Sequence, residues 1–182
     1  LFIIDERIII MSAYEKMSEK ELDQLANYIV SIVQNGASIK DESEIPDGFM
    51  EGDYSFAYDF YQKGKLDEAE AIFKFLCLYD FYNVDYIMGL AAVNQLKKQY
   101  QAAIDLYALA YLNAKNDYRP VFYAGQCNLS IGEKEKAKYC FHQVAQNIND
   151  QTIKEKANSY LELLKDIPLV VLNKEEEKEE KE

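Results

Sequence analysis

A repeat with a period of 34 residues is the feature of this sequence that most restricts its fold. When the chain is aligned with itself at this spacing, three columns each keep one kind of side chain through three copies. Two columns hold small residues and the third holds aromatic residues: Ala57, Ala91 and Gly125; Ala69, Ala103 and Ala137; Phe73, Tyr107 and Phe141. Such a spacing indicates a chain built from repeated structural units that stack on one another.

The columns fit a unit of two helices joined by a short turn. A small residue midway along the first helix lets the second helix cross closely, and the aromatic residue follows one turn after the second small residue. Short segments suited to turns separate the expected helices: Lys63-Gly64-Lys65, Lys97-Lys98-Gln99 and Ile131-Gly132-Glu133. This is the period of the tetratricopeptide repeat, so we expect repeats at 50–83, 84–117 and 118–151.

The array needs a cover at each end, because stacked helix pairs leave the apolar faces of the terminal pairs open. The capping box Ser18-Glu19-Lys20-Glu21 starts an apolar helical pattern that ends at Asn35-Gly36, and a second apolar stripe runs from Ile153 to Leu164. We therefore expect an all-α fold in one domain, 18–167. It contains three repeats in a right-handed superhelix, with flanking helices at 18–35 and 151–166.

The two ends of the chain differ from this array. Residues 1–17 begin with an apolar decamer that charged residues interrupt and that is too short to span a membrane. We expect this segment to be a disordered extension and Met11 to be the natural start. Residues 168–182 combine an apolar patch, 169–172, with a tail of six Glu and three Lys that should be solvated and disordered.

Charge, cysteine content and motifs exclude several classes of function. The 182 residues have a net charge of −12, whereas a surface for nucleic acid or anionic membrane must be basic. One histidine, His142, and three cysteines without a CxxC pair offer too few ligands for zinc. No Gly-rich phosphate loop, GxSxG or HExxH motif occurs, so we predict no catalysis, cofactor or metal. We expect the cysteines to be small buried side chains in a reducing compartment: Cys77, Cys127 and Cys140.

The expected binding site is the concave face of the array, which the first helix of each pair lines. The first of these helices carries a core stripe of Phe49, Phe56, Ala57 and Phe60, and a second stripe of tyrosines, a residue common in recognition surfaces. With the equivalent positions of the next two repeats, the predicted peptide-binding groove comprises Tyr54, Tyr58, Tyr61, Asp85, Met88, Ala92, Gln95, Arg119, Phe122 and Gln126.

The composition of this groove suits a peptide with apolar anchors. A free carboxylate or a phosphate would require clustered cations, and Arg119 alone is a candidate. The alternative is that the tyrosines pack against the N-terminal helix, and the sequence leaves this open.

Several runs outside the three columns carry a more specific pattern. They are Ala37 to Asp41, Ile45-Pro46-Asp47, Tyr58 to Tyr61, Phe75 to Asn83, Met88 to Ala92, Asn116 to Phe122 and Gly125-Gln126-Cys127. These runs resemble the class II chaperones of bacterial type III secretion, and most closely those of invasion-type systems in enteric bacteria. The resemblance covers about residues 25–165, nearly all of the array.

The resemblance implies a chaperone of the bacterial cytoplasm that binds two hydrophobic translocator proteins in its groove and keeps them soluble, apart and secretion-competent. It implies that Tyr54, Tyr58 and Tyr61 are groove tyrosines and that the free chaperone forms a homodimer. Several members also co-activate transcription with an AraC-type regulator, without touching nucleic acid themselves. The alternative is a generic tetratricopeptide interaction scaffold, but one that reads chaperone C-termini would need Lys and Asn in place of Tyr54 and Tyr58.

Overall fold

A computed structural model describes residues 39–42, 47–114 and 116–169 of the chain. The chain divides into two compact units, 1–45 and 46–182, and the described part of the first unit is the short helix α3, Ile39–Glu42. The predicted extension 1–17, the flanking helix 18–35 and residues 170–182 lie outside the described residues. None of the described helices is long and apolar enough to cross a membrane.

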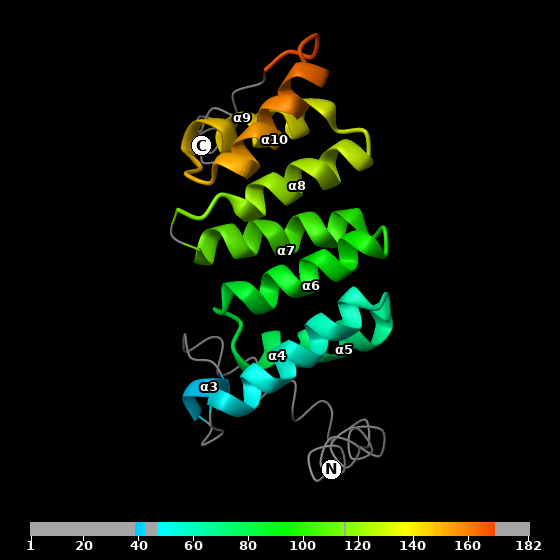
Figure 1. Cartoon of the computed structure of the whole chain (residues 1–182), viewed down its shortest axis with the longest axis vertical. Coiled ribbons are helices and arrows are strands. Elements are labelled where there is room, and N and C mark those ends of the chain that lie inside the picture. The colour runs from blue at the N-terminus through cyan, green and yellow to red at the C-terminus, as the bar shows by residue number, and fades with distance from the viewer. Residues whose placement is uncertain (1–38, 43–46, 115, 170–182) are drawn as a thin grey trace, which may run out of the picture. The chain divides into compact units, whose positions relative to one another are not determined.

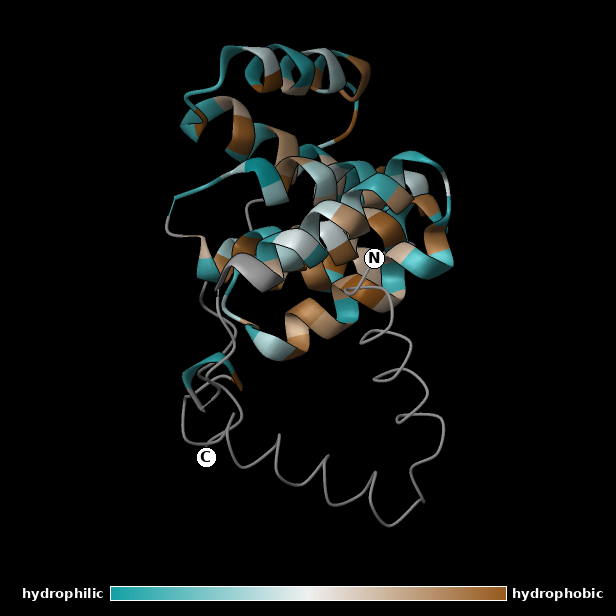
Figure 2. Ribbon diagram, turned by 60° about the horizontal axis from the view of Figure 1, so that its bottom comes forward, coloured by the Kyte–Doolittle hydropathy of each residue, from teal (hydrophilic) through white to brown (hydrophobic). Residues whose placement is uncertain are grey.

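The described part of the second unit is a series of helices without a strand, which confirms the all-α prediction (Figure 1). The helices are α4 (Asp47–Gln62), α5 (Leu66–Tyr79), α6 (Val84–Leu96), α7 (Tyr100–Asn113), α8 (Arg119–Ser130), α9 (Lys134–Asn147) and α10 (Gln151–Leu163). Each helix packs on the next one in the chain, so that α4 with α5, α6 with α7 and α8 with α9 form pairs. Apolar and polar segments alternate along the helices, as expected for helices that bury one face (Figure 2).

The turns within the three pairs share one backbone geometry. The middle residues, Gly64, Lys98 and Gly132, have φ angles of +71°, +60° and +87°. In each turn the next residue donates its N–H to a carbonyl five residues earlier at 2.9 Å, and the middle residue donates to the carbonyl three residues earlier at 3.0–3.1 Å. These bonds form a Schellman motif, which ends a helix on a left-handed residue. The predicted turns are therefore present, and Lys98 adopts a conformation that favours glycine.

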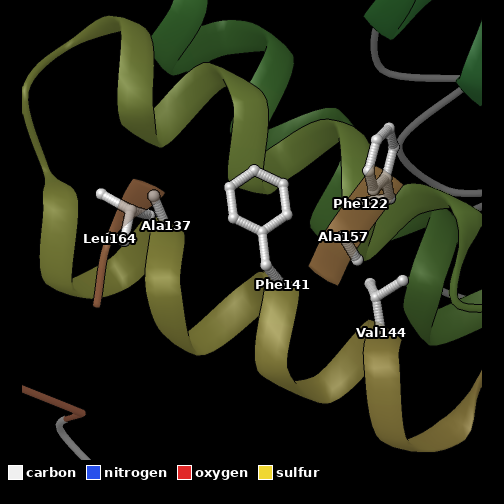
Figure 3. Packing of buried hydrophobic residues seen from close by; sticks show 6 residues of the cluster. All are labelled: Phe122, Ala137, Phe141, Val144, Ala157 and Leu164. Carbon is white, nitrogen blue, oxygen red and sulfur yellow. The ribbon is translucent and has the colours of Figure 1, made fainter. Parts of the chain in front are cut away.

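The three columns of the repeat form the core. Every residue of the two small columns and the aromatic column is buried. In the third pair, the Phe141 ring lies among side chains from α8, α9 and α10 (Figure 3). The small residues thus permit the close helix crossing that the aromatic residues fill, as the spacing predicts.

One expectation about the first helix is wrong. Phe56, expected in the core stripe, is 47% exposed, whereas Met50 and Asp53 are buried beside Ala57 in α4. The equivalent residues of the next two repeats, Leu90 and Ala124, are only 8% and 9% exposed. Ala124 packs into the core cluster of α6 and α7, the preceding helix pair, whereas among the described helices of this unit no pair precedes α4.

Helix α10 covers the other end of the array, as the apolar stripe predicts. Its N-terminus is capped by Asp150, whose side chain accepts a hydrogen bond from the N–H of Ile153 at 3.0 Å. Ala157 is buried, and the ring of Tyr160 stacks on that of Phe141 with centroids 4.4 Å apart. The third pair therefore packs its apolar face against α10.

Candidate functional site

The predicted groove residues lie on α4, α6 and α8, and the period of 34 residues arranges them in rows of equal positions in successive repeats. One row holds Tyr54, Met88 and Phe122, the next holds Tyr58, Ala92 and Gln126, and two shorter rows hold Tyr61 with Gln95 and Asp85 with Arg119. The rows run from one helix pair to the next, in the direction in which an extended peptide would cross the array.

The row of Tyr54, Met88 and Phe122 packs on the aromatic core. The Tyr54 ring meets the Phe73 ring edge-on at 5.9 Å, and Phe122 meets Phe141 in the same way at 5.8 Å. Met88 packs against the core cluster that contains Tyr107. This row is therefore the floor of the candidate site, and its position depends on the core beneath it.

Phe122 belongs to the core as well as to the floor. It is 3% exposed, since it lies in the core cluster with Phe141 and Val144 of α9, and Tyr160 of α10 meets its ring edge-on with centroids 6.1 Å apart. Its partner in the row, Tyr54, is only half-buried. The floor therefore presents the half-buried Tyr54 at the α4 end, whereas Phe122 at the other end is buried beside α10.

The tyrosines of α4 form an accessible aromatic surface. Tyr58 is 48% exposed, and its ring stacks on that of Tyr61 at 6.1 Å. Burial raises the pKa of both Tyr54 and Tyr61, and the negative charge of Asp85 further raises that of Tyr54. Both phenols therefore stay protonated at neutral pH, so each can donate a hydrogen bond while its ring offers apolar area.

A chain of side-chain hydrogen bonds crosses the middle of the site. The hydroxyl of Tyr107 donates to Oε1 of Gln95 at 2.8 Å, and Nε2 of Gln95 donates to Oε1 of Gln126 at 3.4 Å. Nε2 of Gln126 in turn donates to the hydroxyl of Tyr160 at 3.1 Å. Tyr107 and Tyr160 are not among the groove residues predicted from the sequence. The available signal was Tyr107 itself, since the other two residues of its column are phenylalanines and lack a hydroxyl.

Arg119, the one cation among the predicted groove residues, is paired with a carboxylate. Arg119 donates from Nε to Oδ2 of Asp117 at 2.7 Å, and its Nη2 lies 2.6 Å from the same oxygen. Although burial alone would raise the pKa of Asp117, its hydrogen bonds from Arg119 lower it. Arg119 is therefore already paired, which disfavours a free carboxylate or a phosphate as the ligand.

The acidic, histidine and cysteine side chains of the described residues form neither a metal site nor an activated thiol. Among them there is no group of three or more His, Cys, Asp or Glu side chains that could hold a metal ion. Burial raises the pKa of Cys77 to about 12 and those of Cys127 and Cys140 to about 11. At neutral pH these side chains are thiols and poor nucleophiles.

The chain is similar in sequence to a known repeat family and to a known chaperone. A family model described as tetratricopeptide repeat matches residues 50–83 and 84–117, the bounds expected for the first two repeats. The chain is 53% identical over 143 residues to the chaperone protein SicA of Salmonella typhimurium; the alignment covers 79% of this chain and 87% of SicA.

Two solved structures share the fold. The type III secretion chaperone SycD of Yersinia enterocolitica, in complex with a peptide of the translocator YopD, has a TM-score of 0.64 at 30% identity, covering 68% of this chain and 97% of SycD. PcrH of Pseudomonas aeruginosa, with the chaperone binding region of PopD, has a TM-score of 0.64 at 28% identity, covering 68% and 96%. These matches confirm the tetratricopeptide fold, and they confirm a non-enzymatic class, since the matched proteins are chaperones.

Proposed function

The chain belongs to the class II, tetratricopeptide-repeat chaperones of type III secretion, and we propose that it binds translocator proteins along the inner face of α4, α6 and α8. The observation that carries the proposal is the tyrosine surface of α4. Tyr58 and Tyr61 present stacked rings, and Tyr54 lies beside them on the aromatic core. Solved relatives with the same fold are described as complexes with translocator peptides, which supports a peptide as the ligand.

The chemistry of the site suits a segment with apolar anchors. The rings of Tyr54 and Tyr58 offer apolar area, and their hydroxyls offer hydrogen bonds to a peptide backbone that leaves water. The charged pair of Arg119 and Asp117 satisfies itself and leaves no net charge to recognise an ionic ligand. A generic scaffold that reads acidic C-termini would need free cations at these positions, so the structure favours the chaperone function.

The physical benefit of this binding lies in the cargo. Translocators are hydrophobic, and a chaperone that covers an apolar segment of each while remaining acidic outside would keep the complex soluble, with the two translocators apart and ready for secretion. We place this activity in the bacterial cytoplasm, before secretion. When no translocator is bound, we expect the chaperone to form a homodimer.

The experiment that tests the proposal is co-expression with the translocators of the same secretion system, followed by measurement of the affinity. We expect a soluble complex, and we expect the double variant Tyr54→Ala with Tyr58→Ala to bind at least about 10-fold more weakly, because aromatic anchors dominate such interfaces. The single variant Tyr58→Ala leaves the contact between Tyr54 and the core intact. A loss of affinity in this variant is therefore not caused by a disturbed fold.

The matched control is Tyr82→Ala. Tyr82 lies in the turn between α5 and α6 and is 49% exposed, nearly the same as the 48% of Tyr58, so its replacement removes a similar exposed ring outside the site. Unchanged affinity in the double variant, or an equal loss in Tyr82→Ala, would contradict the assignment of the groove.

A second role, with an AraC-type transcription regulator, is a further part of the proposal. The net charge of −12 argues against direct contact with DNA, so the chaperone would act through the regulator as its partner. A reporter for a regulated promoter should be expressed more strongly with the chaperone than without it. Equal expression in the two strains would refute this role.

A further inference from the structure

Two glutamines occupy the middle of the groove on neighbouring first helices. Gln95 lies on α6 and Gln126 on α8, both side chains are half-buried, and their amides are joined by the hydrogen bond of 3.4 Å. They stand between the tyrosine surface of α4 and the covered end of the floor at α10. A peptide that crosses the array from one end to the other would therefore pass over both amides.

Both amides keep hydrogen-bonding capacity for a ligand. A glutamine side chain has two N–H donors and an oxygen that accepts two hydrogen bonds. In the chain from Tyr107 to Tyr160, Gln95 and Gln126 each use one donor and one acceptor position. Each therefore offers one N–H and one acceptor position, which match the one N–H and one carbonyl that every residue of an extended peptide must satisfy.

The two tyrosines at the ends of the hydrogen-bond chain hold these amides in place. Tyr107 is 1% exposed and its ring stacks on that of Tyr123 at 5.6 Å, while the ring of Tyr160 stacks on Phe141. Because both hydroxyls are attached to rings fixed by packing, the glutamines lose little conformational freedom when a ligand arrives. Groups that are ordered in advance bind with a smaller entropic cost.

We infer that Gln95 and Gln126 hydrogen-bond the backbone of an extended segment of the bound translocator, and that Tyr107 and Tyr160 position them for it. Contacts to the backbone do not depend on the side chains of the cargo. This part of the groove would thus serve translocators of different sequence equally, while the tyrosines of α4 select their apolar anchors. The inference rests on the proposed function and assigns a separate role within the same groove.

The test uses the full chain and peptides that tile the sequence of the translocator that co-purifies with it. In the peptide that binds most tightly, each backbone amide in turn is replaced by an ester, which removes the N–H donor and weakens the carbonyl acceptor. We expect one or two adjacent positions at which the ester weakens binding about 5- to 10-fold. In Gln95→Leu or Gln126→Leu, the unmodified peptide should bind about 10-fold more weakly and the sensitivity to the ester at that position should disappear.

A purely structural role for the hydrogen-bond chain gives a different result. The glutamine variants would then lower the melting temperature and weaken all peptides alike, with the sensitivity to the ester retained, and this would overturn the inference. Tyr107→Phe keeps the stacked ring and removes only the hydroxyl, so it should reduce the sensitivity to the ester with little change in folding. If no peptide binds the unmodified chain, the proposed function is contradicted. If a peptide binds and its affinity is insensitive to every ester, the inference about the glutamines is contradicted and the proposed function is not.

Discussion

The ring of Phe73 fills the space beside Gly89 that a side chain would occupy. A Cβ atom at Gly89 would overlap this ring, with Cδ1 of Phe73 only 2.6 Å away. Phe73 is buried in the aromatic column, and Tyr54 of the groove packs on it. The absence of a side chain at Gly89 therefore lets α6 approach the core on which one end of the candidate site is built.

Replacing Gly89 by alanine should destabilise the protein by about 2 kcal/mol, because the added methyl group displaces a fully buried ring. Urea unfolding followed by circular dichroism measures this change. The matched control is Gly52→Ala in α4, where no atom lies within 4 Å of the added Cβ. There the better helix propensity of alanine should stabilise the chain by up to about 1 kcal/mol. A neutral Gly89→Ala would mean that the ring of Phe73 can move without cost.

Gly89 shows how far the repeat predicts the fold. The period of 34 residues predicts the helix pairs, the three core columns and the places of the turns, because these depend on spacing alone. It offers no reason for a glycine at 89, since the equivalent residues are Ser55 and Tyr123. It also cannot distinguish Phe56 from Leu90, which differ in burial although they take equal positions in successive repeats.

Lys98 gives a prediction about the turns. It is the middle residue of the second Schellman turn, with φ of +60°, where the other two turns have Gly64 and Gly132. A residue with a Cβ in this conformation destabilises the folded chain by roughly 1 kcal/mol or more. A glycine avoids this strain, but it also makes the unfolded chain more flexible, which cancels part of the gain in stability. Lys98→Gly should therefore raise the free energy of unfolding by about 0.5–1 kcal/mol.

Two further variants separate conformation from charge. Lys98→Ala removes the same charge and keeps the Cβ, so it should bring no comparable gain. Gly132→Ala should lose about 1 kcal/mol, because it introduces the strain that Lys98 already has. Equal stabilities of Lys98→Gly and Lys98→Ala in denaturant unfolding would contradict the explanation.

The candidate site was predictable to a smaller extent than the fold. The spacing predicts which residues take equal positions on α4, α6 and α8, and all three helices are present. Burial of Phe122 was not predictable, because its core cluster includes residues of α10, a helix outside the three repeats. The hydrogen bonds of Gln95 were likewise not predictable, since they depend on which side chains of different helices come within hydrogen-bonding distance.

Lys97 joins the first two helix pairs and gives a prediction about pH. Its Nζ lies 2.7 Å from Oδ1 of Asp67 and also pairs with Glu70, both on α5. Hydrogen bonds from Lys74 and Lys97 lower the pKa of Glu70. A carboxyl whose pKa is lower in the folded chain stabilises the fold above its unfolded pKa, and this stabilisation is lost as the pH falls through the folded value.

Lys97→Met should therefore be less stable than the unmodified chain at neutral pH, and the difference should shrink in acid as Glu70 becomes protonated. Thermal unfolding at a series of pH values measures this. The control is Lys63→Met, the equivalent position one repeat earlier, where the ion pair found among the described residues is with Asp59 at the end of α4, 2.6 Å away. Such a surface pair contributes little, so Lys63→Met should show a much smaller difference. A difference for Lys97→Met that stays constant from neutral to acid pH would rule out the ion pair as its cause.

The three cysteines should be unreactive in the folded chain. Burial raises the pKa of Cys77 to about 12 and those of Cys127 and Cys140 to about 11. The thiolate is the form that reacts with iodoacetamide. A thiol with a pKa of about 11 has about 100-fold less thiolate near pH 8 than a thiol with an ordinary pKa. Mass spectrometry should therefore find little alkylation of the native chain over a time in which all three cysteines react in concentrated urea. Modification of Cys77 or Cys140 at the rate of the unfolded chain would show that these half-buried side chains are open to solvent in the native state, whereas Cys127, which is fully buried, should react last.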